Sequence, residues 1–199
     1  MVVIGIIGGV ACGKSFVAKQ LGSLGAEVID VDRIGHDVLR DTDVRAALVQ
    51  RWGDEVLDAD GRISRSAVGK RVFANNSDGR GNLEFLEGLV HPKIGETIRM
   101  RIEALSRDDP GKPVVVDAAL LIEADWAGFC DKIVFLEVPR EVRLARAKQR
   151  GWSETEFSQR EAAQGNLDLK RKQADWVMDN SGSAEHTFAE VQQFWRTFE

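Results

Sequence analysis

The sequence contains only two cysteines, Cys12 and Cys130, which lie far apart in the chain. They provide no disulfide framework, and no Cys-x-x-Cys pair indicates a metal or redox site. No apolar run approaches the roughly 18 residues that a membrane-spanning helix requires. The first residues, "MVVIGIIGG", are too short and too rich in glycine for a signal peptide. We therefore expect a cytoplasmic protein without a membrane partner.

Positive charge is also scarce, because 27 lysine and arginine residues stand against 32 aspartate and glutamate residues, for a net charge of −5. This balance argues against general nucleic-acid binding. We find neither internal repeats nor low-complexity segments. A chain of 199 residues with 43% hydrophobic and 30% charged residues fits one compact domain or a core with an insertion.

Apolar runs alternate with helical patterns and predict an α/β fold, a parallel sheet with helices on both faces. The first run, "VVIGII", is apolar almost throughout, as in a strand that is buried on both faces. Further strands are predicted at residues 26–32, 111–122, 131–138 and 174–180. Helical patterns are predicted at residues 15–24, over most of 33–100, at 140–151 and at the end of the chain.

The segment "GGVACGKS" fits the phosphate-binding pattern G-x-x-x-x-G-K-[ST], from Gly8 to Ser15. Its backbone N–H groups must turn toward one anion, which Cβ atoms would obstruct. Lys14 then supplies a point charge to the β- and γ-phosphates, and Ser15 a hydroxyl to Mg²⁺. Cys12 is interpreted as a small loop residue. A glycine-rich turn with a chance Lys-Ser pair is the alternative, but strand, loop and helix occur in the required order.

Three classes of protein with a phosphate loop are the alternatives for this chain. A GTPase needs N-K-x-D to read guanine, which the sequence lacks, although residues 32–35 match the loose D-x-x-G pattern. A non-catalytic regulator would lack a suitable acid or suitable arginines. A small-molecule kinase needs an acid near the acceptor hydroxyl and cations around the transferring phosphoryl group.

Candidate acids end the second predicted strand, at the edge where open α/β sheets bind ligands. Asp30 and Asp32 are two residues apart, so in an extended chain their side chains point the same way. Either one could accept the acceptor proton or help to hold Mg²⁺. The alternative role for either residue is a helix N-cap.

Candidate cations are concentrated between residues 140 and 172. Arg143, Arg146 and Arg150 follow a spacing of three and then four, so they share one helix face. We interpret the group as a lid that closes on ATP and excludes water, with a solvated basic surface as the alternative. The basic residues are Arg140, Arg143, Arg146, Lys148, Arg150, Arg160, Lys170, Arg171 and Lys172.

Together with the phosphate loop, the segments "VIDVDRIGHDVL", "LVHPKI", "VVVDAALLIEADW", "RLARAKQRG" and "AAQGNLDLKRKQADWVMDNSGS" resemble the dephospho-CoA kinase family. They occur in the family's order and extend over nearly the whole chain. The resemblance implies transfer of phosphoryl from ATP, with Mg²⁺, to the ribose 3′-hydroxyl of dephospho-CoA, the final step of coenzyme A biosynthesis. It implies a P-loop NTPase core (1–35, 100–142 and 172–199), a helical acceptor domain (36–99) and a helical lid (143–171).

The resemblance also assigns roles to individual residues. Asp32 falls on the base that acts on the ribose hydroxyl, Arg146 on the lid arginine at the ATP phosphates, and Lys14 keeps its catalytic charge. Asp117 resembles a Walker B acid, and Gln164 and Lys170 are weaker candidates. The acceptor-side residues are Asp32, His36, Arg65, His91, Leu120 and Glu123. The ATP-side residues are Gly9, Val10, Ala11, Cys12, Gly13, Lys14, Ser15, Phe16, Arg146, Asn180, Ser181 and Gly182, of which the last three fall at the adenine end, with a plain turn as the alternative.

Three positions depart from the family's usual pattern. Phe16 replaces a threonine whose hydroxyl can reach the α-phosphate, Ala119 replaces a proline, and Arg143 replaces a glutamine. None of these changes removes a group on which the chemistry depends. A kinase of the same build that acts on another nucleoside, nucleotide or small alcohol is the alternative function.

Overall fold

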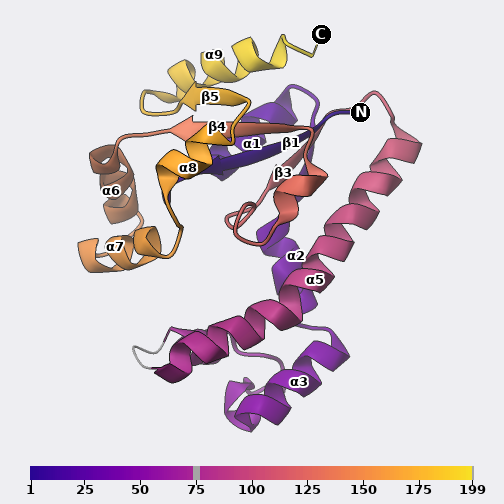
Figure 1. The fold of residues 1–199 in the computed structure, drawn as a ribbon, viewed down its shortest axis with the longest axis vertical. Helices are drawn as coiled ribbons and strands as arrows, with labels where there is room; N and C mark the ends of the chain where they lie inside the picture. The colour runs from indigo at the N-terminus through magenta and orange to yellow at the C-terminus, as the bar shows by residue number, and fades with distance from the viewer. Residues whose placement is uncertain (74–76, 199) are drawn as a thin grey trace. The chain divides into compact units, whose positions relative to one another are not determined.

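Five strands pair in parallel, in the order β2-β3-β1-β4-β5 (Figure 1). The computed structural model describes residues 1–73 and 77–198 of the chain. All residues of the central strand β1 are buried, which explains the nearly unbroken apolar run at the N-terminus. The predicted parallel α/β sheet is therefore confirmed. The strands are Val3–Gly8 (β1), Glu27–Asp30 (β2), Val114–Asp117 (β3), Lys132–Glu137 (β4) and Trp176–Asp179 (β5).

The strand order reverses beside β1. The chain runs from β1 outward to β2, returns to β3, and then continues on the other side of β1 with β4 and β5. In open parallel sheets, ligands bind at the carboxyl ends of the strands next to such a switch point. The loop that follows β1 is the predicted phosphate loop, so the topology places it where a nucleotide is expected.

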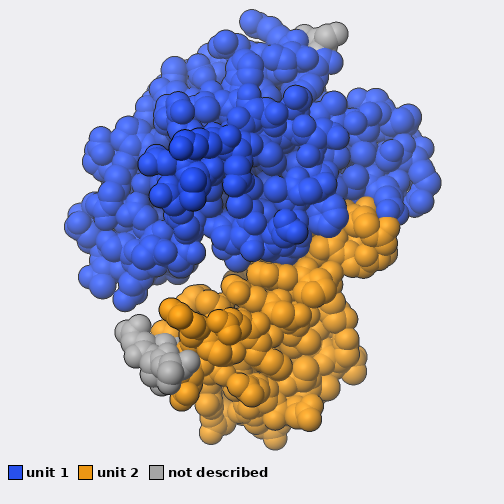
Figure 2. Space-filling model, viewed as in Figure 1, with its two compact units in different colours: residues 1–30, 101–199 blue, residues 31–100 orange. Residues whose placement is uncertain are grey.

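The chain divides into two compact units, residues 1–30 with 101–199, and residues 31–100 (Figure 2). The first unit contains the sheet and helices α1, α6, α7, α8 and α9, together with the short helix η2. These elements are Lys14–Ser23 (α1), Trp126–Phe129 (η2), Arg140–Gln149 (α6), Glu154–Ala162 (α7), Leu167–Lys172 (α8) and Ala184–Trp195 (α9).

Helices α1 and α9 pack on one face of the sheet. Side chains such as Ile4, Leu21 and Phe194 form the main hydrophobic cluster there. On the other face, β1 is approached closely at Gly5, where a Cβ atom would lie 2.5 Å from Leu121 Cδ2 and 2.9 Å from Cys130 Sγ. The segment that follows β3 therefore packs directly on the backbone of β1, and a larger residue at position 5 would displace it.

In its described residues the second unit is helical, apart from one β-bridge between Leu57 and Ile63 that closes a turn. Helix α2 meets α5 where a Cβ at Gly35 would lie 3.5 Å from Ile94 Cδ1. Trp52 packs edge-on against Phe85. The helices of the second unit are Val31–Val38 (α2), Thr42–Trp52 (α3), Asp54–Val56 (η1), Arg65–Val72 (α4) and Ser77–Asp108 (α5), and the last residues of α5 belong to the first unit.

The predicted acceptor domain, 36–99, falls inside the second unit, and the predicted lid, 143–171, belongs to the first. The roles assigned to those segments stay predictions. Residues 74–76 of the acceptor range and residue 199 of the core range lie outside the described residues. In the part of the chain that the structure describes, no helix combines the length and apolar character that a membrane crossing requires.

Two strand predictions were wrong at their carboxyl ends. Strand β2 ends at Asp30, and Asp32 lies in the first turn of α2, so the two side chains do not alternate along one extended strand. A helix forms here instead of a longer strand because Val31, Ile34 and Val38 are buried on one face at helical spacing. Strand β3 ends at Asp117, and the apolar residues after it form turns whose buried side chain is Leu121.

Candidate active site

The phosphate loop occupies the gap between β1, which ends at Gly8, and α1, which begins at Lys14. Gly13 has φ of 95°, and a Cβ there would lie 2.5 Å from the side-chain nitrogen of Asn180. Ala11 also adopts a left-handed φ, of 61°. Glycine at position 13 is therefore required both by the backbone and by the neighbour, while position 11 tolerates the small alanine side chain.

The other loop glycines are needed for close packing behind the loop. A Cβ at Gly9 would lie 2.8 Å from Arg143 Nη1, and one at Gly8 would lie 2.7 Å from Cys12 Sγ. The Cys12 side chain is fully buried beneath the loop. These glycines are therefore required not only for anion access but also because side chains fill the space on their far side.

The start of α1 has the properties of an anion site. The N-cap is Gly13, which has no side-chain capping bond, and the first turn holds no acidic residue. Within the described residues, no hydrogen bond or salt bridge engages the Lys14 ammonium group. Ser15 is exposed beside it. The positive end of the helix and the lysine charge are therefore both available to a phosphate.

Phe16 does not offer a spare main-chain donor. Its N–H donates a 3.0 Å hydrogen bond to the carbonyl of Gly13, and its side chain is 38% exposed. A contact of Phe16 with the α-phosphate would thus need either a shift of the first helical turn or a second acceptor for the same N–H.

Arg146 and Asn180 converge on one carbonyl of the phosphate loop. Asn180 Nδ2 donates to Cys12 O at 2.6 Å, and Arg146 Nη1 donates to the same oxygen at 3.3 Å. Arg146 Nη2 also donates to Asn180 O at 2.8 Å, and Thr187 Oγ1 donates to Asn180 Oδ1 at 2.5 Å. The amide of Asn180 is thus committed within the protein, whereas the guanidinium of Arg146 has further N–H groups to offer.

The turn after Asn180 is held by its own hydrogen bonds. The Ser181 N–H donates to Asp179 Oδ1 at 2.8 Å. The hydrogen bond from the Ser181 side chain, then this N–H bond, and to a smaller extent His186 lower the pKa of Asp179. A Cβ at Gly182 would lie 2.8 Å from His186 Cδ2. The predicted adenine-side residues therefore lie next to the phosphate loop, which Asn180 contacts directly.

Most of the basic residues between positions 140 and 172 are neutralised by neighbouring carboxylates. Arg146, Arg150 and Lys172 have no such ion pair among the described residues, and of these three only Arg146 hydrogen-bonds to the phosphate loop. The others are paired as Arg140–Glu161, Arg143–Glu161, Lys148–Glu154, Arg160–Glu156, Lys170–Glu123 and Arg171–Glu137.

The predicted acids and leucine of the first unit lie at or after the strand ends. Asp30 and Asp117 are register neighbours at the ends of β2 and β3. Glu123 accepts a hydrogen bond of 2.5 Å from Lys170, whose side chain is buried on α8. Leu120 is half-buried in the turns that follow β3. Glu123 is therefore already charge-neutralised in this structure.

The remaining acceptor-side candidates belong to the second unit. Asp32 and His36 are four residues apart on α2 and share a helix face. His91 is on α5, which packs against α2 at Gly35, and Arg65 is the exposed first residue of α4. Within this unit, α2 and α5 thus carry three of the four candidates.

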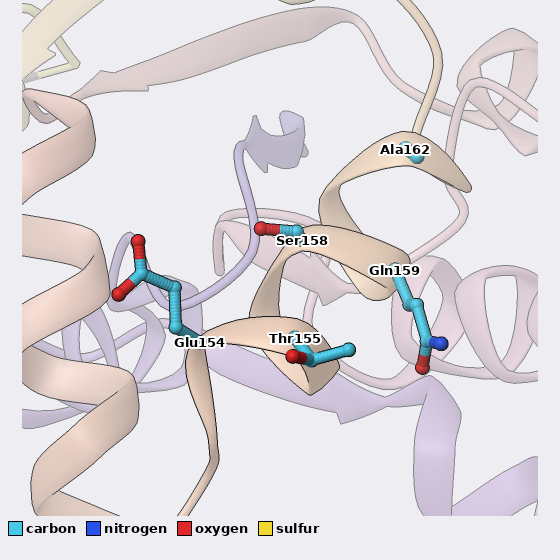
Figure 3. A pocket seen from close by; sticks show the side chains of 5 residues that line it. All are labelled: Glu154, Thr155, Ser158, Gln159 and Ala162. Carbon is cyan, nitrogen blue, oxygen red and sulfur yellow. The ribbon is translucent and has the colours of Figure 1, made fainter.

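A surface hollow of about 450 Å³ lies along α7 (Figure 3). Its lining is mainly the side of one helix, and it includes none of the predicted site residues. Among the described residues, no three His, Cys, Asp or Glu side chains are grouped so as to hold a metal ion. The lining residues are Glu154, Thr155, Ser158, Gln159 and Ala162.

Residues 2–186 match the family model of dephospho-CoA kinases. The chain belongs to the dephospho-CoA kinase family. It is 40% identical over 198 residues to the dephospho-CoA kinase of Geobacter metallireducens, covering 98% of this chain and 96% of the relative.

Two solved structures resemble this dephospho-CoA kinase family member along nearly its whole length. A Thermus thermophilus crystal structure aligns with a TM-score of 0.80 at 31% identity, covering 98% of this chain and 96% of the other. A dephospho-CoA kinase from Campylobacter jejuni aligns with a TM-score of 0.73 at 25% identity, covering 98% and 95%. The predicted family and its P-loop kinase fold are thereby confirmed.

Several supporting residues of the candidate site are not apparent from the sequence. Thr187 orients the Asn180 amide, and Arg143 with Glu161 lies behind the phosphate loop. Arg143 did carry a signal, because it replaces the glutamine usual in the family. Thr187 carried none, since one threonine on an amphipathic helix is unremarkable in sequence.

Proposed function

We propose that the chain transfers the γ-phosphoryl group of ATP to the ribose 3′-hydroxyl of dephospho-CoA, giving coenzyme A and ADP. The observation that carries this proposal is the family match over residues 2–186, combined with a phosphate loop that Arg146 contacts. Family membership supports the acceptor, and the loop supports the donor.

The phosphate loop and α1 act on the donor. The unneutralised N-terminus of α1 and the Lys14 ammonium balance the charge of the β- and γ-phosphates. Arg146 keeps guanidinium N–H groups beyond those it donates to Cys12 and Asn180, and these stabilise the charge that develops on the transferring group. Asn180 holds the phosphate loop in place for both Lys14 and Arg146.

Asp32 is proposed as the base. It accepts the proton of the 3′-hydroxyl as that oxygen forms a bond to the γ-phosphorus, and the bond between the γ-phosphorus and the bridging oxygen of ADP breaks. The carboxylate is exposed in the first turn of α2, so it can reach a bound acceptor without first losing a buried partner.

The acceptor-side proposal includes charged and apolar groups. His36, Arg65 and His91 supply hydrogen bonds and positive charge toward the phosphates of dephospho-CoA. Leu120 and Glu123 contribute from the first unit, and Glu123 does so as a partner of Lys170. Ser181 and Gly182 are proposed to lie against the adenosine of ATP.

The donor set fits Mg²⁺ bound mainly through the nucleotide. Mg²⁺ keeps several waters and takes few protein ligands in kinases. The exposed hydroxyl of Ser15 would hold it, with Asp30 and Asp117 nearby at neighbouring strand ends. When bound, the ion neutralises charge on the β- and γ-phosphates.

We further propose a three-part organisation with the residue ranges given above, a cytoplasmic location, and small molecules as the only substrates. Lid closure by residues 143–171 would exclude water from the transfer. The predicted cation group contributes to this mainly through Arg146, because most of its other members are paired with carboxylates.

The test is an assay of ADP release with MgATP, with and without dephospho-CoA, and mass analysis of the product. We expect ADP release that depends on dephospho-CoA and a product with the mass of coenzyme A. ADP release only with another alcohol or nucleotide would retain the kinase and overturn the acceptor. Nucleotide binding without turnover on any acceptor would favour a regulator.

A further inference from the structure

Arg143 is a charged residue that the core encloses. Its side chain on α6 is only 5% exposed, and its guanidinium lies directly behind the phosphate loop, where a Cβ at Gly9 would be 2.9 Å from its Cζ. Burying a guanidinium is costly unless each of its donors is matched. The partners it satisfies therefore indicate what it does.

Every nitrogen of this guanidinium has an acceptor. Nε donates to Val138 O at 3.2 Å, Nη1 donates to Val10 O at 3.4 Å, and Nη2 donates to Glu161 Oε1 at 2.8 Å. Its bond to Val10 engages a main-chain carbonyl of the phosphate loop. One cation thus connects the loop, the end of β4 and helix α7.

The outer side of the loop is also packed against the same helices. Val10 and Ala11 form a small hydrophobic cluster with Ala147 on α6 and Phe157 on α7. Arg143 Cζ lies 5.6 Å from the centroid of the Phe157 ring. Ala11, which has a left-handed φ, belongs to this cluster. Helices α6 and α7 therefore pack against the loop at a residue with a strained backbone.

We propose that Arg143 is a positioning residue for the ATP phosphates, which holds the phosphate loop in its binding conformation from behind and joins it to α7 through Glu161. This inference rests on the proposed function, because it concerns the same nucleotide site. Arg143 touches no substrate. It acts through the backbone of residues 9–12, whose N–H groups must stay aligned for the anion.

Arg140 provides a matched control. Its Nε donates to the other oxygen of Glu161 at 2.8 Å, and its Cζ lies 5.2 Å from the Phe157 ring centroid. It therefore shares the acid and the ring with Arg143, but the structure gives it no hydrogen bond to the loop. Replacing either arginine by methionine keeps most of the side-chain volume and removes the charge.

The experiment compares Arg143→Met with Arg140→Met by calorimetric titration of ADP and by steady-state kinetics. We expect Arg143→Met to weaken ADP binding and raise KM for ATP about tenfold or more, with KM for dephospho-CoA nearly unchanged. Arg140→Met should stay within about twofold of the parent chain. Equal ADP affinities in the two variants would overturn the proposal.

Arg143→Gln keeps an amide donor at the position and adds a second comparison. We expect its ADP affinity to fall between those of the parent chain and Arg143→Met, and it replaces Arg143→Met in the test if that variant does not fold. An Arg143→Gln variant that binds ADP no better than Arg143→Met, with both folded by circular dichroism, counts against the positioning role. Because ADP binding is read without the acceptor, failure on dephospho-CoA would remain a separate result.

Discussion

The side-chain amide of Asn180 donates a 2.6 Å hydrogen bond to the carbonyl of Cys12, 168 residues away in the chain. The loop after β5 therefore fixes the loop after β1. Asn180 is 2% exposed, and its amide oxygen accepts a hydrogen bond from the Thr187 hydroxyl. Both the nitrogen and the oxygen of the amide therefore have partners within the protein. A residue that family resemblance places at the adenine end of the site thus has a clear structural role at the phosphate end.

Replacing Asn180 by aspartate should destabilise the protein. A carboxylate oxygen would face the Cys12 carbonyl in place of an N–H donor, so two buried acceptors would meet without a hydrogen between them. We expect a loss of about 3 kcal/mol or more in the free energy of unfolding at pH 7, measured by urea denaturation. Thr187→Val is the control, because it leaves the bond to Cys12 intact and should cost about 1 kcal/mol. Equal losses in both variants would contradict this reading.

Arg146→Ala should reduce kcat by a factor on the order of 10² or more. The physical reason is the loss of charge stabilisation at the transferring phosphoryl group. Steady-state kinetics with saturating ATP and dephospho-CoA would measure it. Arg196→Ala, which removes an exposed arginine just after α9, is the matched control and should be neutral. An unchanged kcat with a raised KM for ATP would make Arg146 a simple binding residue.

Asp32→Asn should abolish most of the chemical step, because an amide cannot accept the hydroxyl proton. We expect kcat to fall by about 10² or more, while ADP affinity stays close to that of the parent chain. Asp37→Asn is the control, since this acid lies on the same helix and, among the described residues, forms a salt bridge only with the exposed Arg40. Near-normal kcat in Asp32→Asn would rule out its role as the base.

The contribution of Glu161 should depend on pH. Burial alone would raise the pKa of its carboxyl, but the hydrogen bonds from Arg140 and Arg143 outweigh burial and lower this pKa. A carboxyl with a lowered pKa stabilises the fold fully above its unfolded pKa of about 4.3, and this stabilisation is lost as pH falls through the folded pKa.

The measurement is the difference in unfolding free energy between the parent chain and Glu161→Gln from pH 7 to the acid limit of folding. We expect a constant difference down to about pH 5 and a decreasing one below about pH 4.3. Glu190→Gln, which removes a carboxylate without a salt bridge among the described residues, is the control for this measurement. A Glu161→Gln difference that does not change with pH would show that the ion pairs add nothing.

Much of the first unit could be predicted because its signals are local. The apolar runs predict the positions of the strands. Eight consecutive residues, from the end of β1 to the start of α1, identify the phosphate loop. The strand ends were harder. "VIDVD" alternates like a strand, yet the helical spacing of Val31, Ile34 and Val38 decides in favour of α2. The apolar segment "ALLI" also fits a strand. In the structure it forms turns, and its Leu121 is buried against Gly5 of β1.

The support of the site could not be predicted because it depends on distant pairs. Arg143 meets Val10, 133 residues away, and Asn180 meets Cys12. The sequence predicts positions 143, 146 and 150 as one basic helix face of a lid that closes on ATP. In the structure the first is buried, the second is half-buried and the third is exposed. Only the packed tertiary structure separates these three environments.

The two thiols provide an internal reporter of opening in this protein. Cys12 is fully buried beneath the phosphate loop, and burial, with a smaller effect of Asp131, raises the pKa of Cys130 to about 12. Since the thiolate is the reactive form, neither should modify quickly while the sheet is intact. The rate at which a thiol reagent labels each cysteine therefore measures how often its surroundings open. Saturating nucleotide should slow the labelling of Cys12 more than that of Cys130.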